Sequence, residues 1–181
     1  MMGHINNLLI AMVEKHHGSE GVARLFALAR TSRKHYQLEI IYPEEEFQAL
    51  YAAAKSIYGV EDEAAQQAFA DYFMEVSPVM FPAIFTVAGN ARTLFEKIPT
   101  IHKQWPAATS AKEFRQKLCV IESSSERLVF KYDSPNRLCG VLRFVAQGVL
   151  DYYHETGTVT ETQCVLEGAP WCEVEVRFAT S

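Results

Sequence analysis

The stretch "KYDSPNRLC", residues 131–139, separates a strand pattern from a helix pattern. Before it, "RLVFKY" (127–132) is a short β-rich run, and after it "LCGVLRFVAQGVLDYYHETG" (138–157) is typical of a helix that ends at a glycine. A phenol, a hydroxyl and a guanidinium lie close together in it: Tyr132, Ser134 and Arg137. These groups can hydrogen-bond a pair of carboxylates from one strand-to-helix turn, although Tyr-x-Ser-Pro is also ordinary turn chemistry.

Strand patterns continue on both sides of this helix. "KLCVIES" (117–123) precedes "RLVFKY" across a short "SSE" connection, which predicts a hairpin. "TVTETQCVLEGAPWCEVEVRF" (158–178) predicts two alternating strands around a tight turn at Gly168–Pro170. The expected order is therefore β-β-α-β-β.

The chain before residue 107 has helical spacing of apolar residues throughout. The expected helices lie within residues 5–12, 19–28, 43–59, 61–77 and 91–105. The third begins after Pro43 with three glutamates and ends at Gly59. With no repeat or linker, the sequence predicts one α+β domain over 1–181, in which a helical N-terminal half (1–107) packs on a C-terminal half (108–181) containing an antiparallel sheet.

Composition excludes several classes of function. The chain has 181 residues and a formal charge of −5, with 17 Lys and Arg scattered among 22 acids, so no basic stripe is available to bind nucleic acid. The sequence contains no run of 18 apolar residues, so it predicts no membrane span, and the N-terminus lacks the features of a signal peptide. We therefore expect a cytoplasmic protein. Neither a paired nucleophile and base nor a phosphate loop points to an enzyme.

His102 falls on the apolar face marked by Leu94, Ile98 and Ile101. Such a histidine is more often a core residue than a metal ligand, and the helix pattern alone favours the core interpretation. The other five histidines show no metal-ligand spacing.

The order of helices, then His102, then "YDSPNRLC", then a helix and a hairpin resembles the bacterial haem-nitric oxide/oxygen binding (H-NOX) domains. The resemblance covers essentially the whole chain. It implies b-type haem with His102 as the iron ligand and Tyr132 and Ser134 at the propionates. The family's arginine stands two residues after the serine, where this chain has Asn136, so Arg137 would have to take its place. The family's proline before "FR" is also absent from "SAKEFRQ" (110–116), which favours a flatter haem.

The resemblance also places the walls of the distal haem pocket. The residues carried over are all apolar: Ile5, Leu9, Met74 and Leu142. A bound dioxygen needs a hydrogen-bond donor, whereas nitric oxide binds ferrous haem without one. No Tyr or Trp occurs between Leu138 and Leu150, so the pocket is expected to favour nitric oxide.

Cys164 and Cys172 are equidistant from Gly168, so a hairpin centred there would place them opposite each other, able to share a metal or form a disulfide. The resemblance extends to family members with a zinc-thiolate site made by cysteines at three places: Cys139, Cys164 and Cys172. Their histidine ligand is replaced here by Glu161, so the fourth ligand is Glu161, His154 or water. The plainer interpretation is three half-buried thiols.

The resemblance implies a haem-based nitric oxide sensor that regulates a separately encoded partner, a histidine kinase or a cyclic-di-GMP enzyme. Strain or rupture of the bond between His102 and iron would let the helical half move against the sheet half. The main alternative is a haem-free or haem-independent zinc and thiol redox sensor on the same fold, since Asn136 replaces a haem-binding arginine. A binding module for a small apolar ligand is the third possibility.

Overall fold

A computed structural model describes residues 1–38, 40–104, 118–134 and 138–179. The described residues form two compact units. The first unit contains Met1–Ala65, and the second contains Gln66–Gln104 and residues 118–179. The helices after residue 65 therefore belong with the sheet, whereas the sequence suggested a division at residue 107. The assignment of the whole chain to one domain stays a prediction.

The first unit is built from two helices that pack together, α1 (Gly3–Ala29) and α2 (Glu44–Tyr58). The sequence predicted two helices within α1, and the structure has one element broken by Gly18, which takes a φ of 63°. The ends of α2 are those expected, because Pro43 precedes it and Gly59 closes it in the left-handed conformation.

The N-terminus is fastened to the connection between α1 and α2. The Gly3 amide donates to the Ile40 carbonyl at 2.9 Å, and the Met1 amino group donates to the Tyr42 carbonyl at 2.6 Å. Gly3 is required here, since a Cβ at this position would lie 2.0 Å from the backbone oxygen of Gln37.

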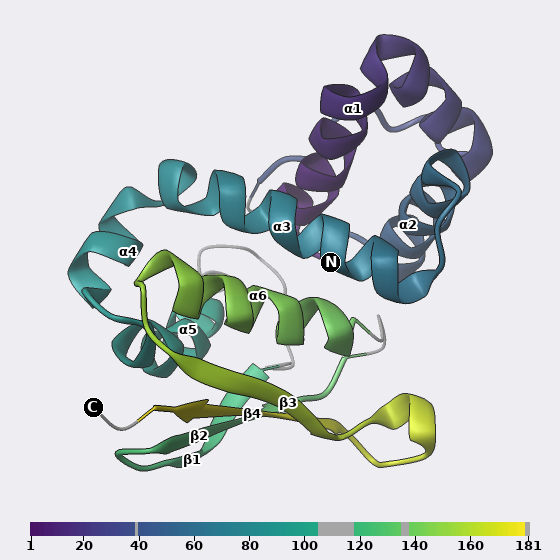
Figure 1. The fold of residues 1–181 in the computed structure, drawn as a ribbon. Coiled ribbons are helices and arrows are strands. Elements are labelled where there is room, and N and C mark those ends of the chain that lie inside the picture. The colour runs from purple at the N-terminus through teal and green to yellow at the C-terminus, as the bar shows by residue number, and fades with distance from the viewer. Residues whose placement is uncertain (39, 105–117, 135–137, 180–181) are drawn as a thin grey trace. The chain divides into compact units, whose positions relative to one another are not determined.

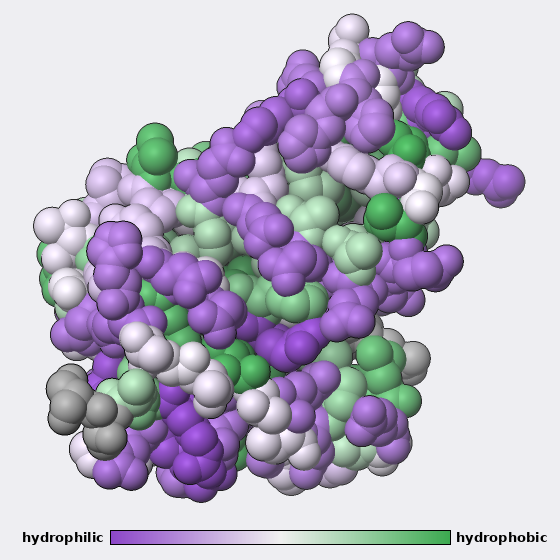
Figure 2. All heavy atoms as spheres, in the orientation of Figure 1, coloured by the Kyte–Doolittle hydropathy of each residue, from purple (hydrophilic) through white to green (hydrophobic). Residues whose placement is uncertain are grey.

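Four helices belong wholly or mostly to the second unit: α3 (Asp62–Met80), α4 (Pro82–Ala88), α5 (Ala91–Gln104) and α6 (Cys139–Tyr152). The sequence did not predict α4. It begins with a proline in its first turn and is only 7 residues long, too short for an apolar period to show. Hydrophobic side chains reach the surface where α3 leads into α4 (Figure 2), and Val79 and Met80 are exposed there. No helix in the described part of the chain is long and apolar enough to cross a membrane.

The sheet of the second unit has four antiparallel strands in the order β1-β2-β4-β3. They are β1 (Leu118–Ser123), β2 (Arg127–Tyr132), β3 (Gly157–Gln163) and β4 (Cys172–Phe178). With α6 between β2 and β3, the expected β-β-α-β-β order and the α+β class are confirmed. The tight turn expected at Gly168–Pro170 is wrong: β3 and β4 are joined by residues 164–171, which include the 3-10 helix η2 (Val165–Glu167).

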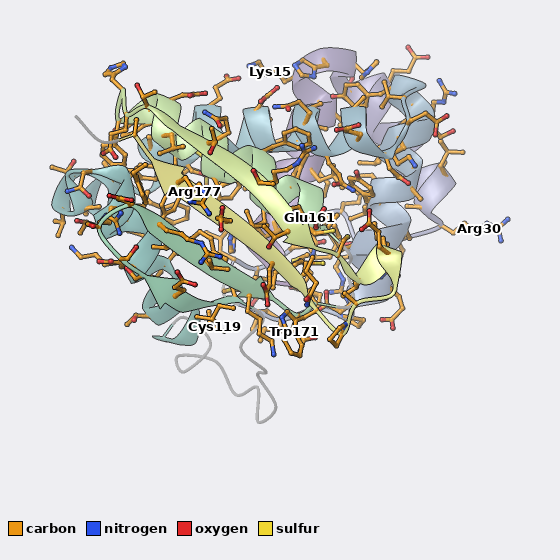
Figure 3. The ribbon with its side chains drawn as sticks, turned by 60° about the horizontal axis from the view of Figure 1, so that its bottom comes forward. Lys15, Arg30, Cys119, Glu161, Trp171 and Arg177 are labelled. Carbon is orange, nitrogen blue, oxygen red and sulfur yellow. The ribbon has the colours of Figure 1, made fainter. Side chains whose placement is uncertain are left out.

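The core of the second unit lies between one face of the sheet and the helices α5 and α6 (Figure 1). Alternate residues of β2 and β4 point into it, among them Leu128, Phe130, Val174 and Val176, all at most 1% exposed. The other sheet face carries charged side chains and is turned toward the viewer in Figure 3. There Glu175 accepts hydrogen bonds from both Arg127 and Arg177.

Candidate functional site

The strand-to-helix turn that follows β2 is buried at both of its described ends. The alternation of β2 places Tyr132, its last residue, on the core face with Phe130. Ser134 is 8% exposed, and Leu138, which precedes α6, is also buried. Arg137 and Asn136 lie outside the described residues, so the role expected of Arg137 stays a prediction.

Three thiols and one carboxylate converge beside this turn. Cys139 is the first residue of α6, Glu161 lies on β3, Cys164 follows the end of β3, and Cys172 is the first residue of β4. Their ligand atoms all lie within 4.8 Å of one another. We call these four residues the thiol cluster. The structure thus brings together the four residues named for a zinc site from the sequence.

The connection between β3 and β4 builds this geometry. A register shift between Glu161 and Gln163 lets Gln163 pair with Glu173, and Cys164 then lies just beyond the strand. The 3-10 helix that follows turns the chain back, and the Val165 amide donates to the Cys172 sulfur at 3.3 Å. The two cysteines are therefore brought close by an irregular connection rather than by a tight hairpin.

Burial controls the charge state of these thiols. Removal from water raises the pKa of Cys139, and hydrogen bonds with Cys164 and Glu161 raise it further. Burial also raises the pKa of Cys172, although the hydrogen bond from Val165 opposes the effect. The Oε1 oxygen of Glu161 is buried and has no hydrogen-bond partner in the described structure. A cation would satisfy this oxygen and favour the thiolates.

The spacing of the cluster suits a four-coordinate zinc ion. Zinc binds thiolate sulfur at about 2.3 Å, so two sulfurs on a tetrahedral ion stand about 3.8 Å apart. The Sγ atom of Cys164 lies 3.4 Å from that of Cys139 and 4.0 Å from that of Cys172. These distances bracket the zinc value and are far from a disulfide bond of about 2.05 Å. All three cysteines are free thiols, and the residues present fit the metal.

His102 belongs to the last turn of α5, and its side chain lies outside the described part of the structure. The start of the same helix is held firmly. The Ala91 amide donates to the Glu155 carboxylate at 2.8 Å, and the Arg92 guanidinium donates to the Ser125 carbonyl at 2.6 Å. The first turn of α5, the helix expected to carry the iron ligand, is thus hydrogen-bonded to the β1–β2 turn and to the α6–β3 connection. Neither contact could be predicted from the sequence, because both join residues far apart in the chain.

The four residues predicted to wall the distal pocket fall in both units. Met74 on α3 and Leu142 on α6 are partly buried and pack against the core of the second unit. Leu9 on α1 is fully buried and Ile5 is half-buried in the first unit. A common pocket for all four stays a prediction. The apolar surface that Met74 and Leu142 offer within the second unit suits an apolar macrocycle.

The described residues form an α+β fold whose second unit has a strand-to-helix turn with buried ends, beside a cluster of metal-ligand side chains. The chain belongs to the Haem-NO-binding family, whose family model (HNOB) matches residues 2–161. No curated protein matches the chain.

Solved structures with the same fold extend over the whole chain. One is the crystal structure of an H-NOX protein from S. oneidensis in the Fe(II)NO state, with a TM-score of 0.84 and 16% identity over 99% of this chain and 100% of that one. The NMR structure of an H-NOX domain from Shewanella oneidensis in the Fe(II)CO state has a TM-score of 0.83 and 16% identity, and covers 100% of both chains. The unliganded Fe(II) H-NOX protein from K. algicida has a TM-score of 0.78 and 14% identity over 100% of this chain and 98% of that one. These likenesses confirm the predicted H-NOX fold.

Proposed function

We propose that this chain is a haem-based sensor that binds nitric oxide at ferrous haem and regulates a separately encoded signalling protein. The observation that carries the proposal is the match of the Haem-NO-binding family over residues 2–161, which contain every residue assigned here to haem. The family assignment disfavours the haem-free form of the alternative. We propose no enzyme activity, and the cytoplasmic location stays a prediction.

The residues that would hold the haem come from separate elements. His102 on α5 would bind the iron, while Tyr132, Ser134 and Arg137 would bind the propionates by hydrogen bonds and charge. Support comes from the placement of Tyr132 on the core face of β2 and the burial of Ser134. When bound, haem would supply an iron that takes a diatomic gas. Ile5, Leu9, Met74 and Leu142 would exclude water from the place where the gas binds.

The selectivity for nitric oxide follows from this apolar wall. Bound dioxygen carries partial negative charge and is stabilised by a hydrogen-bond donor, whereas nitric oxide needs none. The side chains assigned to the wall offer hydrocarbon and thioether groups only. The ferrous protein is therefore expected to bind nitric oxide and carbon monoxide without forming a lasting dioxygen complex.

The proposed switch lies in α5. A change in the bond between His102 and the iron would act on the last turn of this helix, while its first turn is fastened by Glu155 and Ser125. A helix held at one end and released at the other has two arrangements that a ligand can bias. The partner that reads this change is proposed to be a histidine kinase or a cyclic-di-GMP enzyme, by family resemblance.

Anaerobic titration of the ferrous, haem-loaded protein with nitric oxide tests the proposal. We expect a shifted Soret band that saturates at one nitric oxide per haem, and the same sample should change the activity of a candidate histidine kinase or cyclic-di-GMP enzyme. A haem-free preparation of the same chain is the matched control for the partner assay. A spectrum that does not respond to nitric oxide would contradict the sensor function.

A second candidate function, zinc binding with a thiol redox response, is favoured by one observation: the ligand atoms of the thiol cluster lie within 4.8 Å of one another. Zinc bound by Cys139, Glu161, Cys164 and Cys172 would join α6 to β3 and β4. Hydrogen peroxide would oxidise Cys164 and Cys172 to a disulfide, with two thiols and one peroxide giving one disulfide and two waters. The metal would lose two ligands in that step.

Metal analysis under reducing conditions, followed by peroxide and a thiol count, tests this function. We expect one zinc per chain before oxidation, and after it the loss of zinc together with two titratable thiols. Replacement of Cys119 by Ser is the matched control, because Cys119 lies on β1 outside the cluster. Less than stoichiometric zinc with freely titrating cysteines would reduce the cluster to ordinary core residues.

A further inference from the structure

We propose that a metal ion in the thiol cluster strengthens haem retention, because the cluster holds both ends of the strand-to-helix turn that carries Tyr132 and Ser134. The inference rests on the proposed function, since it requires that haem and zinc both bind. It adds a relation between the two sites: each cofactor is expected to raise the affinity of the chain for the other.

The C-terminal end of the turn is tied to the cluster directly. Cys139 supplies a sulfur to the cluster and is also the first residue of α6. Leu138, just before it, is buried, and Ser134 lies earlier in the same turn at 8% exposure. A metal that fixes the Cys139 sulfur therefore fixes the point at which the turn enters α6.

The N-terminal end of the turn is tied through the sheet. Tyr132, the last residue of β2, pairs with Cys172, the first residue of β4. Its side chain packs against the buried group formed by Cys139, Cys164 and Cys172. The same side chain also packs against the main core of the second unit. Tyr132 is thus a contact between the core, the thiol cluster and the candidate propionate site.

Fixing Tyr132 and the first residue of α6 in place lowers the entropy that Tyr132 and Ser134 lose when they bind a ligand. The thiols of the metal-free cluster are held by burial and weak sulfur hydrogen bonds, whereas a metal would join α6, β3 and β4 by coordinate bonds. A preorganised site binds more tightly, and linkage requires the effect to be equal in both directions. Coupling between sites of this kind changes affinity by roughly 5- to 150-fold.

Haem transfer from the full chain to an excess of apomyoglobin measures the effect. Zinc-loaded protein is compared with the same protein stripped of zinc by a chelator, both under reducing conditions. We expect haem loss to be about tenfold slower with zinc bound, at the lower part of the usual range of coupling. The Cys139→Ser variant should lose haem at the fast rate with or without zinc, whereas Cys119→Ser should behave as the unmodified protein.

The reciprocal measurement needs no variant and so does not depend on whether Cys139→Ser folds. Zinc affinity, measured by competition with a chromogenic chelator, should be about tenfold higher for the haem-loaded than for the haem-free protein. Equal haem loss with and without zinc, together with equal zinc affinities, would overturn the linkage while leaving both binding sites in place. Failure to bind haem or zinc at all would overturn the proposed function and the linkage together.

Discussion

Tyr132 and Cys172 are paired across neighbouring strands, and the tyrosine ring packs against the three buried thiols. One of these residues is a candidate propionate ligand and the other a candidate zinc ligand. Because β2 ends at the first and β4 begins at the second, the two candidate sites share one edge of the core. A ligand that shifts either residue would therefore be expected to shift the other, because the two are paired across neighbouring strands.

The ferrous protein should not form a stable dioxygen complex, because the residues assigned to the distal wall offer no hydrogen-bond donor. Exposure of the reduced, haem-loaded protein to air is expected to give ferric haem without a lasting oxy spectrum. Carbon monoxide, which needs no donor, should bind the same sample under anaerobic conditions. A long-lived oxy spectrum would mean that a polar side chain reaches the iron.

Glu161 should be a zinc ligand and not only a neighbour of the three thiols, since its buried Oε1 oxygen has no hydrogen-bond partner in the described structure. Glu161→Gln removes the charge while keeping the size. Loss of a supporting outer-shell group costs about 10- to 100-fold in metal affinity, so loss of a ligand should cost at least tenfold. Competition with a chelator measures it.

Glu167→Gln provides the matched control for Glu161→Gln, because Glu167 is an exposed glutamate of η2 outside the cluster. Its zinc affinity should equal that of the unmodified protein. Equal affinities for Glu161→Gln and the unmodified protein would assign the fourth position to water or to another residue.

Glu175 should make the stability of the second unit depend on pH. Burial alone would raise the pKa of this carboxyl, but hydrogen bonds from Arg177 and Arg127 outweigh it and the net shift is downward. A depressed pKa stabilises the fold at pH values above the unfolded value of about 4.3, and this contribution is lost as the pH falls through the folded value.

Thermal unfolding of the Glu175→Gln variant between pH 3 and 7 tests this prediction. The variant should be less stable than the unmodified protein at pH 7 and should approach it at the acid end. Glu126→Gln, at an exposed position in the β1–β2 turn, should follow the unmodified protein throughout. A constant difference across this range would remove the titration of Glu175 as the cause.

Glu155 should stabilise α5, because its carboxylate accepts the Ala91 amide at the start of that helix. The helix N-terminus carries partial positive charge and unpaired amides, so the contact combines a hydrogen bond with a favourable charge. Glu155→Ala should lower the free energy of unfolding by roughly 1 kcal/mol. Chemical denaturation measures it, with exposed Glu20→Ala on α1 as the control; equal losses in the two variants would contradict the role.

Sequence reasoning worked best where a local signal fixes an element. Pro43 and Gly59 marked the two ends of α2, and two short β-rich runs predicted β1 and β2 almost to the residue. It failed where the decisive contacts are not local. The short helix α4 has no apolar period, and the connection from Cys164 to Cys172 contains a 3-10 turn in place of the tight turn that symmetry about Gly168 suggested.

The candidate sites also contain some features that could be predicted from the sequence and others that could not. The thiol cluster could be named from cysteine spacing and family resemblance, yet its distances and the hydrogen bond from Val165 required the fold. Glu155 could not be found from the sequence, since its partner Ala91 lies 64 positions away in the chain. The assignment of His102 came from the resemblance, because helical spacing alone favours a core histidine.

The measurement that tests the central claim most directly is the absorption spectrum of the His102→Ala variant. If His102 holds the iron, the variant expressed alone should contain little haem, and growth or reconstitution with exogenous imidazole should restore a Soret band, because imidazole can occupy the vacated position. The unmodified chain should show the band without imidazole. A variant with the same haem content and spectrum as the unmodified protein would contradict the assignment of His102 and with it the proposed sensor mechanism.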